Sequence, residues 1–232
     1  NAAPAQLPIG AEEDFQGIID LVQMNKLVWH DEDLGAKYET LDLNDDERDE
    51  AQMYREELIE SIADFDDELA EKYLGGEEID NKTLVSAIRN AVIHHSFIPV
   101  FCGTAFKNKG VQPLLDAIVD YMPSPIDVGE IKGHDGKDVD KTITRSPDPS
   151  DDFSGLAFKI ATDPFVGQLT YFRIYSGELK AGSQVFNPLE GKKERIGKIL
   201  QMHANKREEL QVASAGDIVA ITGLKFTTTG QT

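Results

Sequence analysis

The sequence predicts an α/β domain that carries an acidic insert and is followed by a small all-β barrel domain. Residues 97–125 predict a buried strand, a glycine turn and an amphipathic helix, which together form half of a parallel βα unit. Residues 153–232 instead hold short apolar runs separated by glycine turns, a pattern typical of a small closed barrel. At 232 residues the chain is long enough for both domains.

The βα unit has three parts. Residues 98–102 are nearly all apolar, which predicts a strand buried on both faces. Gly103 ends the strand, and a small polar loop runs to Gly110. Ligands of open α/β sheets bind just beyond the carboxyl ends of such strands, so this loop is a candidate site. The helix that follows carries apolar residues at helical spacing; they are Val111, Leu114, Leu115, Ile118, Val119 and Met122.

Two apolar segments precede the acidic helices. Residues 5–10 read as the end of a strand, which we expect to begin before Asn1 and to belong to the same parallel sheet as residues 98–102. Residues 17–30 predict a strand or hairpin, with a kink or bulge at Asn25-Lys26.

The insert is expected to hold two helices. Asn44 and Glu47 resemble a capping box, and the apolar spacing beyond them predicts one helix that continues to Tyr73 and ends at Gly75-Gly76. A second helix is predicted to begin near Asp80. Its side chains expected to face the core are Leu84, Ile88, Ala91, Val92 and His95.

Residues 126–152 are rich in Asp, Gly, Pro and Lys, which predicts an interdomain connector with one short strand. The barrel strands are expected at residues 156–162, 168–175, 183–187, 193–202 and 217–222. Six basic residues are predicted to surround one hairpin of this barrel: Lys192, Lys193, Arg195, Lys198, Lys206 and Arg207.

Net charge separates an acidic part of the chain from a basic one. The total is −19, but residues 1–96 hold 25 Asp and Glu against 7 Lys and Arg, whereas residues 155–232 hold 7 against 10. The acidic part repels a phosphate backbone and suits a basic protein partner. Only the C-terminal part is suited to contact with RNA.

Composition argues against several classes of protein. No segment approaches the ~18 apolar residues of a membrane span, and the N-terminal residues lack the features of a signal peptide. The single cysteine, Cys102, cannot form an internal disulfide, which favours a reducing, cytoplasmic location. The five histidines show no ligand spacing with it, so we expect no metal site.

The loop GTAFKNKG, residues 103–110, resembles the guanine-base loop of translational GTPases, G-[ST]-A-x-K-N. The longer string to Pro125 resembles the elongation factor G family. So do FxGxIDLVxM near residue 15 and, in the barrel, DPFVGQLTYFRIYSGELKAG, MHANKREEL and AGDIVAITGLKFTTTG. The resemblance implies that Thr104 and Ala105 contact the exocyclic oxygen of guanine through backbone amides, that Gly103 forms the turn, and that Phe106 helps to wall the pocket.

The resemblance also implies a domain plan and a function. Residues 1–125 are then the C-terminal part of a GTP-binding domain with an insert at about 11–96, residues 126–152 a linker, and residues 153–232 a second domain that is truncated at its C-terminus. The intact protein is expected to bind GTP or GDP with Mg and to promote movement of tRNA and mRNA on the ribosome. Two alternatives remain: a related GTPase of the termination or ribosome-protection type, and a non-catalytic ribosome-binding module.

The family resemblance further implies two contacts with the ribosome. The insert is expected to face the lysine-rich ribosomal stalk protein through an acidic face: Glu56, Glu60, Asp64 and Glu71. The barrel is expected to contact small-subunit rRNA through Lys192, Lys193 and Arg195. From pattern alone, a merely solvated acidic face and scattered surface lysines are at least as common an explanation.

The chain lacks the other motifs of a GTPase. It contains no G-x4-G-K-[ST] phosphate loop and no N-K-x-D. One D-x-x-G match, Asp152 to Gly155, opens the barrel and does not follow a parallel strand, so we attach no function to it. No other catalytic constellation is evident. The chain alone is therefore expected to bind no nucleotide and to be inactive.

Overall fold

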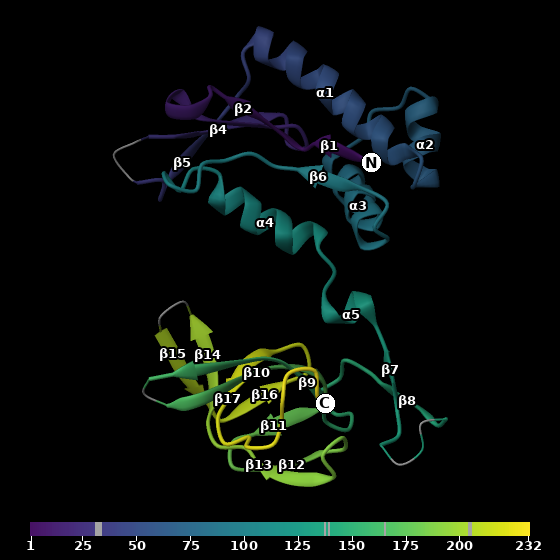
Figure 1. Cartoon of the computed structure of the whole chain (residues 1–232). Helices are drawn as coiled ribbons and strands as arrows, with labels where there is room; N and C mark the ends of the chain where they lie inside the picture. The colour runs from purple at the N-terminus through teal and green to yellow at the C-terminus, as the bar shows by residue number, and fades with distance from the viewer. Residues whose placement is uncertain (31–33, 137, 139, 165, 204–205) are drawn as a thin grey trace. The chain divides into compact units, whose positions relative to one another are not determined.

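The computed structural model describes residues 1–30, 34–136, 138, 140–164, 166–203 and 206–232. The chain forms two compact units, Asn1–Pro123 and Ser124–Thr232, each with its own core (Figure 1). No helix among the described residues is both long and apolar enough to cross a membrane.

The described strands of the first unit form two sheets. A two-stranded parallel sheet pairs β1 (Ala2–Pro4) with β6 (Ile98–Val100). A four-stranded antiparallel sheet holds β2 (Gln6–Ile9), β3 (Gly17–Asp20), β4 (Asn25–Trp29) and β5 (Tyr38–Leu41). The prediction that residues 5–10 belong to the parallel sheet is therefore wrong, because the chain changes sheets at Ala5, whose amide donates to the carbonyl of Val100 (2.9 Å).

Residues 17–30 form a hairpin, one of the two predicted forms. Its turn spans Leu21–Met24, and Asn25 and Lys26 pair regularly with β3, so the predicted kink at these two residues is wrong. The Asp20 carboxylate builds the turn by accepting the amides of Val22 and Gln23, both at 2.8 Å. This is the Asx-turn chemistry that lets an aspartate reverse the chain.

The described residues of the insert form three helices where two are predicted: α1 (Asp45–Ala63), α2 (Asp67–Leu74) and α3 (Asn81–Ile93). The Asn44–Glu47 capping box is confirmed, as is the start of a helix after Asp80. The single long helix is wrong, because the Asp66 side chain caps a new helix by accepting the amide of Leu69 (3.0 Å).

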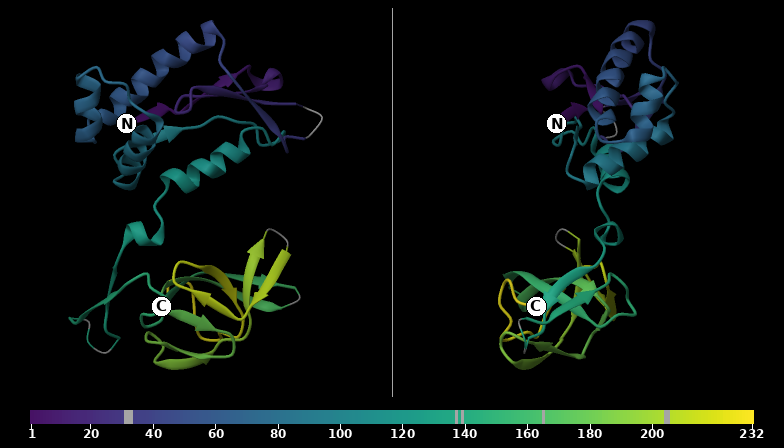
Figure 2. Two further views of the ribbon diagram at one scale, coloured as in Figure 1. Left: turned by 180° about the vertical axis from the view of Figure 1, so that it is seen from behind. Right: turned by 90° about the vertical axis from the view of Figure 1, so that its right-hand side faces the viewer.

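The core of the first unit lies between these helices and the strands (Figure 2). Leu58, Ile62, Leu84 and Ile88 are fully buried, as their helical spacing predicts. His95, expected to face the core, is instead exposed, because α3 ends at Ile93 and the backbone at His95 turns into the left-handed region (φ 56°).

Arg55 is a buried charge in this core. Its guanidinium donates to the carbonyls of Leu21 and Val22, both at 2.7 Å, and to the carbonyl of Ile79 at 3.0 Å. Burial lowers the pKa of Arg55, and the nearby Asp20 carboxylate opposes that shift. One side chain of α1 thereby joins the β3–β4 turn to the segment before α3.

β6 and the following helix α4 (Val111–Tyr121) form the predicted βα unit, but its burial differs from the expectation. Ile98 is 65% exposed and Val100 is 47% exposed, so the strand is not buried on both faces. Among the described residues, β1 is its only hydrogen-bonded neighbour. The apolar stripe of α4 is likewise largely exposed, and the buried side chains of this helix are Pro113, Ala117 and Tyr121.

The second unit begins with a short helix and a hairpin: α5 (Pro125–Val128), β7 (Ile131–His134) and β8 (Thr142–Arg145). The prediction of a connector with a single short strand is therefore wrong. Prolines discourage strands only where they fall within them, and Pro147 and Pro149 lie beyond β8.

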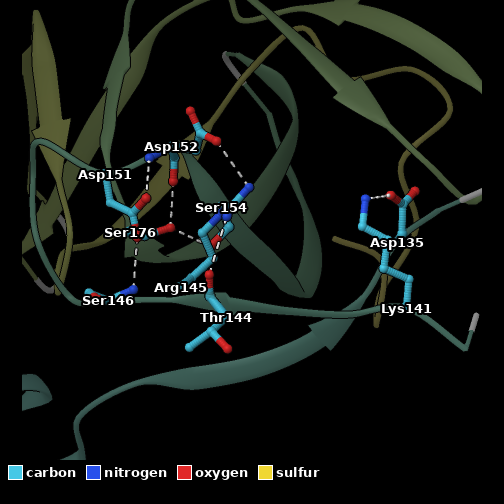
Figure 3. A network of polar contacts seen from close by, with 9 residues as sticks. All are labelled: Asp135, Lys141, Thr144, Arg145, Ser146, Asp151, Asp152, Ser154 and Ser176. Atoms are coloured by element: carbon cyan, nitrogen blue, oxygen red, sulfur yellow. Dashed lines mark hydrogen bonds and ion pairs between the residues drawn. The ribbon is translucent and has the colours of Figure 1, made fainter.

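Polar contacts attach this hairpin to the barrel (Figure 3). Arg145 pairs with the Asp152 carboxylate at 3.2 Å, and the Ser146 amide donates to Asp151 at 2.9 Å. The Ser176 hydroxyl donates to the carbonyl of Asp152 at 2.6 Å. Asp152 of the D-x-x-G match thus takes part in a structural contact.

The barrel fold is confirmed. A five-stranded antiparallel sheet has the order β15–β14–β17–β10–β9, and two short ladders, β11–β16 and β12–β13, lie beside it. The predicted strand at 193–202 is two strands, separated at residues 196–198. The turn motif at residue 165 and the centre of MHANKREEL, residues 204–205, lie outside the described residues. The strands are β9 (Ser154–Asp163), β10 (Gly167–Ser176), β11 (Glu178–Lys180), β12 (Gln184–Asn187), β13 (Lys192–Arg195), β14 (Ile199–His203), β15 (Lys206–Leu210), β16 (Val212–Ser214) and β17 (Ile218–Ile221).

Glu194 is a buried acid that holds the end of the barrel together. Its carboxylate accepts the amides of Lys225 (2.6 Å) and Phe226 (2.8 Å) and the hydroxyl of Thr227. Burial by itself raises the pKa of Glu194, but these hydrogen bonds outweigh it and hold the pKa below its ordinary value.

We predict that Glu194→Ala lowers the free energy of unfolding of the second unit by about 3 kcal/mol near neutral pH, because three donors lose a charged acceptor. A depressed folded-state pKa contributes stability above the unfolded pKa and loses it as pH falls through the folded value. The difference between wild type and variant should therefore shrink toward pH ~3, as measured by urea unfolding. The exposed Glu178→Ala serves as the control, and a difference that stays constant with pH contradicts the assignment.

Candidate functional site

The candidate site is the loop between β6 and α4, residues 103–110. Its two ends cross at Gly103 and Gly110, where the backbones approach too closely for a side chain. A Cβ atom at Gly103 would lie 2.7 Å from the carbonyl oxygen of Lys109, and one at Gly110 would lie 2.8 Å from that of Cys102. Gly110 also has a φ of +86°, which favours glycine.

Hydrogen bonds within the loop hold it closed. The Thr104 amide donates to the carbonyl of Lys109 (2.9 Å), and the Lys109 amide donates back to the carbonyl of Thr104 (3.2 Å). The Asn108 amide donates to the carbonyl of Ala105 (3.3 Å), and Asn108 has a left-handed φ of 54°. The segment from Ala105 to Asn108 is therefore a tight turn at the end of a two-residue bridge.

The tip of this turn is open to solvent. The Phe106 side chain is fully exposed (103%), and Ala105 is exposed beside it. Within the described part of the chain, the amides of Ala105 and Phe106 donate to no acceptor. Two adjacent amides on a small, exposed turn can donate to a carbonyl oxygen of a ligand.

The loop is attached to the insert by side chains that sequence reasoning missed. Lys109 is buried, and its ammonium group donates to the carbonyl of Phe15 at 3.2 Å. Gln112, at the start of α4, donates to the carbonyl of Gly35 at 2.8 Å. The acceptors are backbone carbonyls more than 70 positions earlier, so no local sequence pattern signals these contacts.

Cys102 lies immediately before the loop and packs against the small core cluster of Phe15, Ile18, Leu27 and Trp29. Burial raises the pKa of its thiol to about 11. The thiol is therefore protonated at neutral pH and is a poor nucleophile, so the site offers no thiolate chemistry.

Four side chains of the acidic face, Glu56, Glu60, Asp64 and Glu71, are exposed. Glu56, Glu60 and Asp64 follow at intervals of four, so they form one row along α1 and its C-terminal cap, while Glu71 lies on α2. In Figures 1 and 2, α2 lies at the opposite end of the first unit from the β6–α4 loop. The acidic face and the loop are therefore separate surfaces.

The basic residues of the barrel do not surround one hairpin, so that prediction is wrong. Lys192, Lys193 and Arg195 lie on β13, whereas Lys206 and Arg207 lie on β15, which belongs to a different ladder. Arg207 pairs with Asp163 at 2.9 Å. Only the β13 group remains as a local basic surface, with all three side chains exposed.

No cluster of three or more acidic, His or Cys side chains suited to a metal ion occurs among the described residues. The loop presents amides and an aromatic ring, which suit a flat ligand with a carbonyl oxygen.

Comparison with known proteins gives one match to a family model and one to a solved structure. Residues 152–232 match the model of the family described as elongation factor G domain 2. The chain is also similar to a crystal structure of a protein from Thermus thermophilus, with a TM-score of 0.76 and 25% sequence identity. That match covers 99% of this chain and 31% of the other, so the chain spans about a third of the length of the solved structure.

The family model accounts for most of the second unit, and the solved structure extends the match across both units. These two matches agree with the motifs of the loop and the barrel, and residues 152–232 are similar to domain 2 of elongation factor G.

Proposed function

We propose that this chain is part of a cytoplasmic, ribosome-dependent GTPase that promotes movement of tRNA and mRNA during protein synthesis. The observation that carries the proposal is the match of residues 152–232 to elongation factor G domain 2. The open β6–α4 loop supports it, because its sequence and its exposed amides suit the recognition of a guanine base.

The proposed role of the loop is to bind guanine of GTP or GDP. The Thr104 amide donates to the carbonyl of Lys109 (2.9 Å), so the expectation that it contacts the base is replaced by a role in the bridge that supports Ala105. The backbone at Ala105 then lies against the exocyclic oxygen, Gly103 permits the crossing of the two backbones, and the Phe106 side chain covers one side of the base. The amides of Ala105 and Phe106, which donate to no acceptor among the described residues, fit this role. Phosphates and Mg require groups that this sequence does not contain, so the chain supplies only one wall of the nucleotide site.

The proposed partners match the charges of the two units. The acidic face of α1 and α2 suits a lysine-rich surface of the ribosomal stalk protein, because opposite charges speed association. Lys192, Lys193 and Arg195 on β13 suit small-subunit rRNA, where each phosphate contact adds salt-dependent affinity.

The first test replaces elongation factor G in a purified translation system with the full-length protein. We expect ribosome-stimulated GTP hydrolysis together with movement of the messenger by one codon, measured by primer extension to the ribosome edge. GTP hydrolysis with release or splitting of terminated ribosomes, and no codon movement, would instead assign the protein to the related termination type.

A second test addresses the loop. In the full-length protein, Ala105→Leu should raise the Kd for GDP roughly tenfold or more, because a large side chain holds the amides away from the base and one hydrogen bond is lost. Ser86→Leu, on the exposed side of α3, is the control. The isolated chain should bind a fluorescent GTP analogue negligibly, and micromolar affinity is the result that contradicts this expectation.

A third test addresses the acidic face. Replacing Glu56, Glu60, Asp64 and Glu71 by Lys in the full-length protein should slow stalk-dependent GTP hydrolysis about tenfold or more at low salt, because electrostatic steering is reversed. A control with the same charge change carries Lys at Glu130, Asp140, Glu178 and Glu208, all exposed in the second unit. Equal rates of GTP hydrolysis in the two variants would refute the assignment. So would an equal slowing by the α1–α2 variant on ribosomes that lack the stalk protein.

A further inference from the structure

The side chain of Lys109 is buried at the base of the β6–α4 loop. Lys109 is only 4% exposed, and its ammonium group donates to the carbonyl of Phe15 at 3.2 Å. Burying an ammonium group is costly unless it is hydrogen-bonded. A lysine at this position therefore fixes the distance between the loop and the segment around Phe15.

The acceptor is itself held firmly. Phe15 is 7% exposed and forms a small core cluster with Ile18, Leu27 and Trp29, which anchors it to β3 and β4. Its carbonyl therefore has a fixed position relative to the antiparallel sheet of the insert.

Further contacts attach the loop to the same part of the insert. Lys107 donates to the carbonyl of Glu13 at 3.0 Å, and the Asn108 side chain donates to the carbonyl of Leu34 at 3.3 Å. Gly35 packs against the loop so closely that a Cβ there would lie 2.4 Å from the carbonyl oxygen of Lys107. The loop is thus held against two segments of the insert, one before β3 and one before β5.

Lys109 differs from these other anchors because its backbone also forms the bridge at the base of the turn, whereas the Asn108 backbone donates a single hydrogen bond within the turn, to the carbonyl of Ala105 (3.3 Å). The Lys109 amide and carbonyl form both hydrogen bonds of the bridge to Thr104, the residue that precedes Ala105. A displacement of Lys109 therefore moves Thr104 directly, and with it the amides of Ala105 and Phe106.

We propose that Lys109 is a positioning residue for guanine recognition: its contact with Phe15 uses the insert as a frame that holds the base-contacting amides in place. This inference rests on the proposed nucleotide-binding function of the loop. Lys109 itself does not touch the base, and its effect is on the placement of amides that do.

The test measures binding of two nucleotides to the full-length protein: GDP, and the diphosphate of 2,6-diaminopurine riboside. The second base keeps the 2-amino group but carries an amino group where guanine has its oxygen, so it cannot accept from the loop amides. For Lys109→Met, we expect the Kd for GDP to rise about tenfold while the Kd for the analogue stays nearly unchanged, which lowers the discrimination between them. Lys109→Arg, which keeps a donor, should restore part of that discrimination.

Two further variants complete the design. Lys82→Met removes an exposed lysine from α3 and should leave both constants unchanged. Asn108→Gly removes the contact with Leu34 but tolerates the left-handed backbone, and it should lower the discrimination between the two nucleotides by a smaller factor. This variant provides the test if Lys109→Met fails to fold.

The possible failures can be told apart. If the wild-type protein does not prefer GDP to the analogue, the proposed function fails. If it does, but Lys109→Met and Asn108→Gly discriminate as well as wild type, the positioning role fails. A lower melting temperature with equal weakening of both nucleotides also contradicts it, because that result indicates a merely structural lysine.

Discussion

The close approach of two backbones at Gly103 and Gly110 is the constraint on which the candidate site depends. With no Cβ at either position, the chain leaves β6, crosses itself, and enters α4 after a turn only a few residues long. The crossing makes the Thr104–Lys109 bridge possible, and the bridge in turn leaves two amides at the exposed tip without partners among the described residues. A larger residue at either glycine forces the two crossing backbones apart and breaks the Thr104–Lys109 bridge.

Much of the architecture was predictable because its causes are local. The Asn44–Glu47 capping box, the helical spacing of Leu58 and Ile62, and the alternation of strands and glycine turns in the barrel act over a few residues. The site loop was predictable for a similar reason, since its small residues and glycines occur in one short string. The string does not show which distant segments hold the loop in place. The hydrogen bond from the Lys109 ammonium group to the carbonyl of Phe15 is an example.

The wrong predictions share a different cause. Apolar periodicity continues through Phe65, so it does not reveal that Asp66 starts a new helix by capping it. Apolar content at Ile98 and Val100 indicates burial, but burial depends on which elements cover a strand, and that is a tertiary property. Lys206 and Arg207 are near β13 in sequence, yet antiparallel pairing with β14 carries them to another ladder. Each case requires knowledge of distant partners.

Arg55 has a consequence for how such sequences can diverge. Its guanidinium donates to carbonyls in the β3–β4 turn and in the segment before α3. Substitutions at Arg55 and changes in these two segments are therefore expected to be coupled in evolution. Replacing the arginine leaves buried carbonyls without donors, whereas lengthening the turn removes two carbonyl acceptors from a buried cation. Among relatives, the residue at this position and the length of the turn at Leu21–Met24 should therefore change together or not at all.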